Sequence, residues 1–189
     1  MKPKTISIIG GTGKMGGMFA QAFKEKGYEV IIASRNTEIN IEEASKKGDV
    51  VIVSVPIRET ERVIQKIGSK IKKDALLTDF TSVKVLPCKW MKKYSKAEVI
   101  GGHPVFGQVK DLSKRTFVLC PARGNKYLQW YKDFLEELGM RVFIKTPEQH
   151  DELMAIVQCL NHFSNLTLSS ALIKTRFNMQ ELKAFSSPA

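Results

Sequence analysis

A glycine-rich hexapeptide near the N-terminus constrains the fold of this chain more than any other feature. Residues 11–16 read GTGKMG, directly after the apolar run TISII and directly before a stretch with helical spacing of apolar residues. In a strand–turn–helix unit Gly11 permits a tight turn, Gly13 lets an anion approach the backbone, and Gly16 allows close packing of helix on strand. The free N–H groups at the helix N-terminus then attract a pyrophosphate. The sequence therefore predicts a dinucleotide site, with a purely structural glycine turn as the alternative.

Strand-like runs rich in β-branched residues alternate with amphipathic stretches through residues 1–146. The predicted strands are 5–11, 28–34, 48–57, 75–80, 97–102, 116–121 and 141–146. The predicted helices are 14–27, 59–71, 84–94 and 126–139. This alternation is typical of an α/β fold with an open, doubly wound, mostly parallel sheet of the Rossmann type. We therefore expect residues 1–146 to form a dinucleotide-binding domain.

The character of the sequence changes from Pro147 onward. No charged residue occurs between Leu153 and Ile173, although 26% of the whole chain is charged. Interspersed polar residues make this segment unsuitable as a membrane span. Because a helix without charge on any side is expected to be enclosed by protein, the segment needs more partners than the remaining chain can supply. We expect residues 147–189 to be the start of an all-α domain, either incomplete here or completed by a partner chain.

Composition narrows the classes of protein further. Thirty Lys plus Arg against 19 Asp plus Glu give a formal net charge of +11. The basic residues are scattered, which favours a solvated surface that attracts small anions and argues against a nucleic-acid partner. Apolar runs stay shorter than the ~18 residues of a membrane span, and the N-terminus is not a signal peptide, so we expect no membrane contact and a cytoplasmic location. Three widely spaced cysteines predict reduced thiols and no metal site.

The end of the second predicted strand bears on the choice of cofactor. It reads ASRN, so that Ser34 and Arg35 occupy the place where an acidic residue would bind the ribose 2′-hydroxyl of NAD. A guanidinium suits a 2′-phosphate, which favours NADP over NAD, although Arg35 could instead face solvent or stack on adenine. The loop after the third strand should pass over the cofactor, unless it only terminates the strand. The predicted cofactor-binding residues are Gly11, Thr12, Gly13, Lys14, Met15, Ser34, Arg35, Asn36, Ser54, Val55 and Pro56.

Polar residues follow the fourth and fifth predicted strands. TDFTSVK places Thr81, Ser82 and Lys84 after the fourth strand, and GGHPVFG places His103 after the fifth, where Pro104 stiffens the chain. Ligands bind at this edge of open α/β sheets. A histidine of near-neutral pKa can accept a proton from an alcohol while a hydride leaves the same carbon, provided that a hydrogen-bonding neighbour fixes its tautomer. His103 is therefore the candidate catalytic residue.

Structural alternatives exist for each of these side chains. His103 could be a loop histidine with satisfied hydrogen bonds, and Ser82 could be the N-cap of the helix that begins near VKVLP. Lys84 either contacts an anion of the cofactor or substrate, or is an ordinary exposed lysine.

The charge-free helix offers further candidates. Met154, Gln158 and His162 are four residues apart and therefore share one helical face. We expect Gln158 and His162 to bind the substrate, with buried polar packing as the alternative. His150, next to Asp151, is interpreted as a structural residue in the first turn of this helix.

Five motifs in this order resemble the prephenate dehydrogenase family over essentially the whole chain: GGTGKMGG, VIVSVPI, TDFTSVK, GGHPVFG and HDELMAIVQCLNHF. The resemblance implies oxidative decarboxylation of prephenate to 4-hydroxyphenylpyruvate in tyrosine biosynthesis, with hydride transfer to NAD or NADP. It implies that His103 is the catalytic histidine bonded to the 4-hydroxyl, that Ser82 supports it and that His162 lies on the substrate side. It also implies a homodimer for a full-length form.

One departure from the family pattern concerns the end of the sequence. In the family, an arginine that binds a substrate carboxylate closely follows an SSP turn, and a long helical dimerisation domain comes after it. This sequence ends at FSSPA, so we expect the chain alone to lack full activity on prephenate. The alternatives are an arogenate dehydrogenase, a β-hydroxyacid or imine reductase on the same scaffold, and an NADP-binding module without catalysis.

Overall fold

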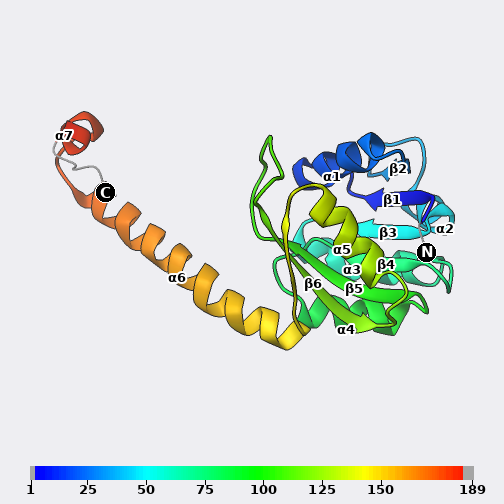
Figure 1. Ribbon diagram of the computed structural model, residues 1–189. Coiled ribbons are helices and arrows are strands. Elements are labelled where there is room, and N and C mark those ends of the chain that lie inside the picture. Colours follow the sequence, from blue (N-terminus) through cyan, green and yellow to red (C-terminus); the bar gives the residue numbers. More distant parts are fainter. Residues whose placement is uncertain (1–2, 185–189) are drawn as a thin grey trace. The chain divides into compact units, whose positions relative to one another are not determined.

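The computed structural model describes residues 3–184 and divides into two compact units, Met1–Asp151 and Glu152–Ala189 (Figure 1). The first unit is an α/β domain. The second contains most of one long helix and a short one. The SSP turn singled out in the sequence falls in residues 185–189, outside the described residues.

A seven-stranded sheet in the order β2-β1-β3-β4-β5-β6-β7 forms the centre of the first unit. The strands are β1 (Thr5–Ile9), β2 (Glu29–Ala33), β3 (Val50–Val53), β4 (Leu76–Asp79), β5 (Glu98–Pro104), β6 (Thr116–Arg123) and β7 (Arg141–Ile144). Strands β2, β1, β3, β4 and β5 pair in parallel, whereas β6 runs antiparallel to β5 and pairs in parallel with β7. The predicted doubly wound, mostly parallel sheet is confirmed.

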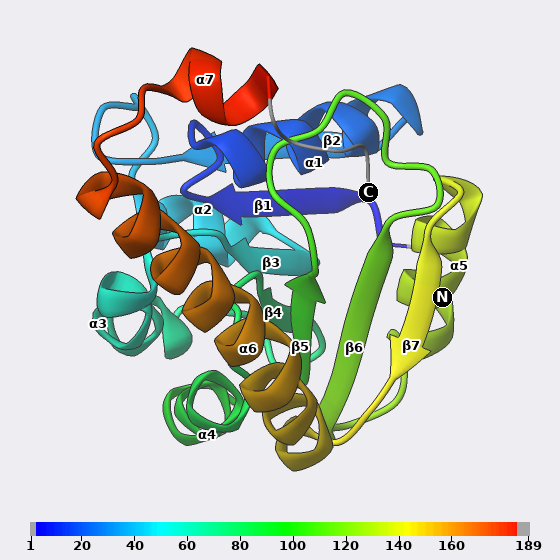
Figure 2. The same ribbon diagram turned by 90° about the vertical axis from the view of Figure 1, so that its left-hand side faces the viewer.

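Helices cover both faces of this sheet. They are α1 (Lys14–Glu25), α2 (Ile41–Lys47), α3 (Ile57–Gly68), α4 (Val85–Tyr94) and α5 (Leu128–Glu137). Buried residues of α1 and α5 share one hydrophobic cluster, and those of α2, α3 and α4 share the other. Figure 2 shows α3 and α4 on the side of the sheet opposite to α5.

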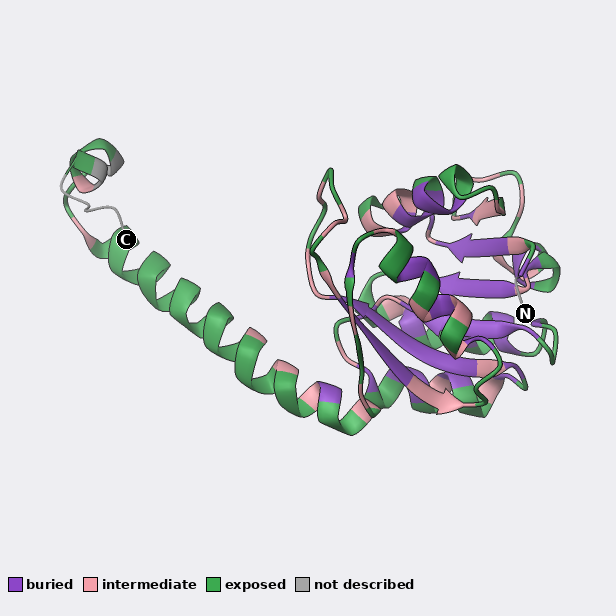
Figure 3. Ribbon diagram, in the orientation of Figure 1, coloured by how far each residue is buried: buried purple, intermediate pink, exposed green. Residues whose placement is uncertain are grey.

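The strand residues alternate between these two clusters. In β3, Val50 and Ile52 belong to the cluster with α1 and α5, whereas Val51 and Val53 belong to the cluster with α3 and α4. Side chains of a strand point alternately to opposite faces, so a strand covered on both faces is apolar throughout. Figure 3 shows these central strands as buried.

Helix α2 is an element that the sequence analysis did not predict. It has only seven residues, and its buried residues are the small Ala44 and Ser45. Two features of the sequence favour this helix. The Asn40 side chain is its N-cap and accepts a hydrogen bond from the Glu43 N–H at 2.9 Å. Acidic residues in the first turn and lysines in the last turn complement the helix dipole.

Helix α6 (Pro147–Lys174) begins at the predicted domain boundary, but its first turn, through Asp151, belongs to the first compact unit. Helix α7 (Met179–Ala184) follows it in the second unit. Figure 3 colours most of α6 as exposed. Its exposed residues include large apolar ones, and Phe177 after the helix is exposed as well: Leu153, Ile156, Val157, Leu160, Phe163, Leu166, Leu168, Leu172, Ile173 and Phe177. Within residues 3–184, no helix combines the length and apolar character that crossing a membrane requires.

Candidate active site

The glycine loop joins β1 to α1 and has less room for side chains than the motif alone indicates. Gly10 has φ +84°, and a Cβ there would lie 2.2 Å from the carbonyl oxygen of Ser54. The left-handed residue of the turn is therefore Gly10, whereas the sequence analysis placed the tight turn at Gly11. A Cβ at Gly11 would instead meet Ile32 at 2.9 Å, and one at Gly16 would meet the Gly10 carbonyl oxygen at 2.7 Å. Close packing explains both glycines.

The N-terminus of α1 suits a phosphate group. Its N-cap is Gly13, which has no side chain to occupy the free N–H groups, and its first turn contains no acidic residue. Both the helix dipole and the unpaired N–H groups favour an anion at such a position. The local structure therefore fits the pyrophosphate of a dinucleotide.

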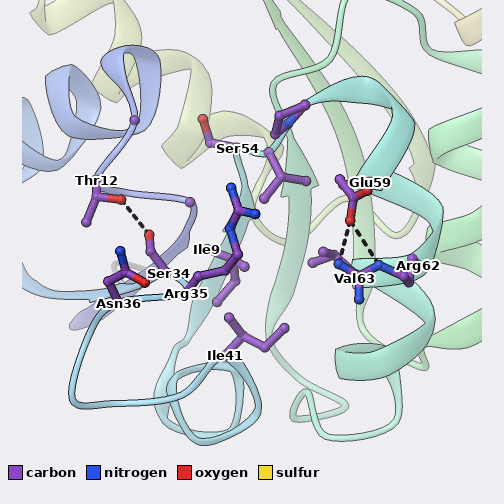
Figure 4. Close-up of a pocket in the computed structure, with 14 residues that line it drawn as sticks. Ile9, Thr12, Ser34, Arg35, Asn36, Ile41, Ser54, Glu59, Arg62 and Val63 are labelled. Carbon is purple, nitrogen blue, oxygen red and sulfur yellow. Dashed lines mark hydrogen bonds and ion pairs between the residues drawn. The ribbon is translucent and has the colours of Figure 1, made fainter.

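A cavity of about 580 Å³ opens beside this loop (Figure 4). Eight of the predicted cofactor-binding residues line it: Thr12, Gly13, Ser34, Arg35, Asn36, Ser54, Val55 and Pro56. Three do not. Gly11 is buried against Ile32, Met15 packs against the hydrophobic core, and Lys14 lines a neighbouring hollow with Thr12 and Gly13.

Charged and polar side chains line the part of this cavity beside the end of β2. The Thr12 hydroxyl donates a hydrogen bond to the Ser34 hydroxyl at 2.8 Å, joining the glycine loop to the end of β2. Arg35 is exposed, and among the described residues its guanidinium forms no ion pair. Arg62 on α3 also lines the cavity and is paired with Glu59, as Figure 4 shows. Sequence reasoning missed Arg62 because it lies on α3, 27 residues after Arg35 in the sequence, and only the fold brings both residues to one cavity.

His103 stands near the end of β5 and is only 4% exposed. His103 does not line the cavity beside the glycine loop. Its Nδ1 lies 2.8 Å from Nε2 of His150. Burial lowers the pKa of His103 to about 3, with a further lowering by the Lys84 ammonium. The ring is therefore neutral at physiological pH. The preceding glycines serve close packing, since a Cβ at Gly102 would lie 2.8 Å from the Asp79 carbonyl oxygen.

His150 is more than the structural residue that the sequence analysis assigned. It does lie in the first turn of α6, with its N–H bonded to the Thr146 carbonyl, and it is 1% exposed. Its ring, however, connects His103 to Asp151, whose Oδ1 lies 2.7 Å from His150 Nδ1. In the sequence, the signal for this role was the adjacent pair His150 and Asp151 at the start of a helix. That pair does not reveal that His150 contacts His103, which lies 47 residues earlier.

Asp151 also caps α4. Its Oδ1 accepts the Lys84 N–H at 2.7 Å, and its Oδ2 accepts the Val85 N–H at 3.0 Å. Burial raises the pKa of Asp151, but the hydrogen bonds from Val85, His150 and Lys84 outweigh it and leave the pKa lowered. The N-cap alternative for Ser82 is therefore wrong, because Lys84 holds the N-cap position and Asp151 satisfies the N–H groups. Ser82 itself is exposed.

Lys84 fits neither of its two expected roles. Its side chain is fully buried, and Nζ donates to Asp79 Oδ2 at 2.6 Å and to the Gly102 carbonyl oxygen at 2.6 Å. The Asp79 carboxylate accepts a further hydrogen bond from the N–H of Thr81. Lys84 thus joins the ends of β4 and β5 and adds a positive charge near His103.

Gln158 and His162 lie on α6 within the second unit, and their contact with a substrate stays a prediction. Over the described residues, histidine, cysteine and carboxylate side chains do not gather in any group of three that could hold a metal ion.

Comparison with curated proteins shows relatives along nearly the whole chain. Residues 19–144 match the family model described as "Prephenate dehydrogenase, nucleotide-binding domain". The "Probable arogenate/prephenate dehydrogenase" of Methanocaldococcus jannaschii is 39% identical, over 97% of this chain and 46% of the relative. The "T-protein" of Haemophilus influenzae is 34% identical, over 97% of this chain and 49% of the relative. This chain thus spans about half the length of these relatives.

Solved structures agree. A prephenate dehydrogenase from Aquifex aeolicus superposes with a TM-score of 0.76 at 26% identity, over 89% of this chain and 70% of that one. A second structure from A. aeolicus, in complex with hydroxyphenyl propionate and NAD+, has a TM-score of 0.77 at 24% identity, covering 94% and 72%, and shares the fold. Fold and glycine loop define the first unit as a nucleotide-binding α/β domain. The chain belongs to the prephenate dehydrogenase family.

Proposed function

We propose that this chain carries the cofactor-binding and proton-accepting part of an NAD(P)-dependent dehydrogenase that converts prephenate, or its amino analogue arogenate, with loss of CO2. One observation carries the proposal. In a chain of this family, the neutral and buried His103 and the glycine loop, which fits a pyrophosphate, both lie at the carboxyl ends of parallel strands, and therefore at the same edge of the sheet.

The residues of this chain have separate tasks in such a reaction. The glycine loop and the α1 N-terminus hold the pyrophosphate, and Arg35 and Arg62 lie where the adenosine end would bind. When bound, a nicotinamide cofactor supplies the acceptor for the hydride from the ring carbon that carries the hydroxyl. His103 accepts the hydroxyl proton as that hydride leaves. Loss of the ring carboxylate as CO2 leaves its bonding electron pair in the ring, and His103 returns the proton to the resulting phenolate oxygen.

The choice of cofactor forms a finer part of the proposal. Arg35 is exposed, unpaired among the described carboxylates and positioned in the cavity, while no acidic residue follows β2 directly. These features favour NADP, because a guanidinium binds a phosphate in a bidentate manner. NAD remains the alternative cofactor.

Substrate contacts and assembly are also proposals. Gln158 and His162 would contribute to the substrate side of the site, with Ser82 near the histidine. The exposed apolar side chains of α6 suit a homodimer, because contiguous apolar surface of this kind marks interaction sites.

A two-substrate, two-cofactor assay tests this function. The purified chain is incubated with prephenate or arogenate and with NADP+ or NAD+, and reduced nicotinamide is measured by absorbance. We expect turnover of one substrate, at a rate reduced by the missing carboxylate-binding arginine, with a preference for NADP+. Tight cofactor binding without turnover of either substrate would instead support the alternative of a non-catalytic binding module.

A further inference from the structure

We infer that Asp151 and His150 are positioning residues for His103: together they fix the tautomer in which His103 Nδ1 carries the proton and Nε2 is left free to accept one. The inference deepens the proposed function and rests on it for the catalytic role of His103. The tautomers themselves can be measured without any turnover.

The direction of the hydrogen bonds is set at the Asp151 end. Two backbone N–H groups, those of Lys84 and Val85, donate to its carboxylate. These donors stabilise the ionised form, which can only accept hydrogen bonds. The Nδ1 atom of His150, at 2.7 Å from Oδ1, must therefore carry a proton and donate it.

The hydrogen bond between His150 and His103 also has only one possible direction. A neutral imidazole with a proton on Nδ1 has a lone pair on Nε2. His150 Nε2 is therefore an acceptor, and the atom 2.8 Å from it, His103 Nδ1, must be the donor. The remaining ring nitrogen of His103, Nε2, is then unprotonated. This is the nitrogen that a base uses, so the network prepares His103 for proton transfer.

The opposite arrangement fails on charge. If His103 Nδ1 were the acceptor, His150 would need protons on both ring nitrogens, because Asp151 already requires one on Nδ1. Burial lowers the pKa of His150, against the raising effect of Asp151, and the pKa stays below its ordinary value. Lys84 supplies the nearby positive charge, paired with Asp79. A second buried cation beside this ammonium is disfavoured.

Asp151 also links the network to the loop that carries Ser82. Its carboxylate accepts the N–H groups of Lys84, the last residue of TSVK, and of Val85, the first residue of α4, while it orients His150 on α6. Ser82 is exposed, whereas His150 and His103 are buried side by side. The hydrogen-bonding neighbour that fixes the tautomer of His103 in this structure is therefore His150.

Nitrogen NMR of histidine-labelled protein tests the tautomers directly. The chain has three histidines, so three ring systems appear, and a His162→Gln sample identifies one of them. His150→Gln then separates the other two. We expect both His103 and His150 as neutral rings with the proton on Nδ1. A proton on Nε2 of either ring at neutral pH would overturn the inference.

Kinetics test the consequence, with cofactor binding as the control for folding. His150→Leu and His150→Gln remove the imidazole; Gln still offers an acceptor oxygen to His103. We expect His150→Leu to lower kcat about 10- to 100-fold with little change in KM, and His150→Gln to recover part of the loss. Glu148→Gln, which removes a carboxylate from the same helical turn but no hydrogen bond of the network, should leave kcat unchanged.

The two possible failures can be told apart. If His150→Leu binds cofactor normally and its kcat equals that of the wild type, the positioning role is wrong whatever the substrate. If the NMR tautomers are as expected but neither prephenate nor arogenate is turned over, the network stands and the proposed function is wrong. If His150→Leu does not fold, the wild-type NMR spectrum and His150→Gln still decide.

Discussion

In the cavity beside the glycine loop, the groups that could bind an anion are backbone N–H groups and exposed arginines. Around His103, by contrast, the titratable side chains are buried or, for Asp151, partly buried, and they are hydrogen-bonded to one another. Exposed charges act through solvent and are screened by salt. When one partner of a buried hydrogen bond or ion pair is removed, the group that remains incurs its full desolvation penalty. Substitutions in the cavity should therefore weaken ligand binding by small factors. Substitutions in the network around His103 should cause large losses in the free energy of unfolding or in kcat.

The largest effect on stability should come from the buried ion pair. Lys84→Met leaves the Asp79 carboxylate buried without its cation, since the side chains of both residues are fully buried. We expect a loss of about 3–5 kcal/mol in the free energy of unfolding. Denaturant unfolding measures it, and Lys89→Met, an exposed lysine on α4, should change little. Equal effects of the two substitutions would show that the buried pair is not special.

A backbone position in the glycine loop should come next. Gly10→Ala places a Cβ at φ +84° and 2.2 Å from the Ser54 carbonyl oxygen. The left-handed conformation and this clash should cost about 2 kcal/mol or more and weaken cofactor binding. Gly107→Ala is the matched control, because nothing lies within 4 Å of its added Cβ. Thermal unfolding and cofactor titration measure both variants. Unimpaired cofactor affinity in Gly10→Ala would contradict this structure of the loop.

The buried histidine should make stability depend on pH. The pKa of His103 falls from its ordinary 6.5 to about 3 on folding, so between these values the unfolded chain binds a proton that the folded chain does not. Stability is therefore lost as pH falls below 6.5, by at most about 2 kcal/mol from this residue between pH 7 and pH 5. His103→Asn should reduce that slope in unfolding curves. Lys84, His150 and Asp151 face the ring and remain in both proteins. An unchanged slope would mean that the ring is hydrated.

The smallest effect should occur at the exposed arginine. Arg35→Ala should raise the KM for NADP about tenfold and change that for NAD much less, because it removes a charge-assisted contact to a 2′-phosphate. Arg58→Ala, an exposed arginine of α3 that does not line the cavity, is the control. Raising the salt concentration should narrow the difference between NADP and NAD. Equal changes for both cofactors would remove the NADP preference.

Local patterns explain what the sequence could predict. The seven strands could be predicted because β-branched runs such as VVIV are features of neighbouring residues in the sequence. The edge of the sheet that would hold the cofactor could be predicted for the same reason, from the glycine spacing and from the ends of the strands. Helix α2 was missed because seven residues with small buried side chains carry little apolar periodicity. The antiparallel turn from β5 to β6 follows from residues 105–115, which form no helix to carry a parallel crossover.

The network around His103 lay beyond such reasoning for a physical reason. Its hydrogen bonds join residues 47 and 67 positions apart, and they form only when the first turn of α6 docks beside β5 and α4. His150 therefore looked like an ordinary first-turn residue. Lys84 looked exposed because lysine is rarely buried, and only its ion pair with Asp79 makes the buried position favourable.

The most direct measurement is kcat for His103→Asn against wild type, at saturating cofactor and with whichever of prephenate or arogenate the wild type converts. If the neutral imidazole accepts the hydroxyl proton, kcat should fall by several orders of magnitude while cofactor binding and substrate KM change much less. An asparagine variant that binds cofactor normally and retains the wild-type kcat would contradict the account.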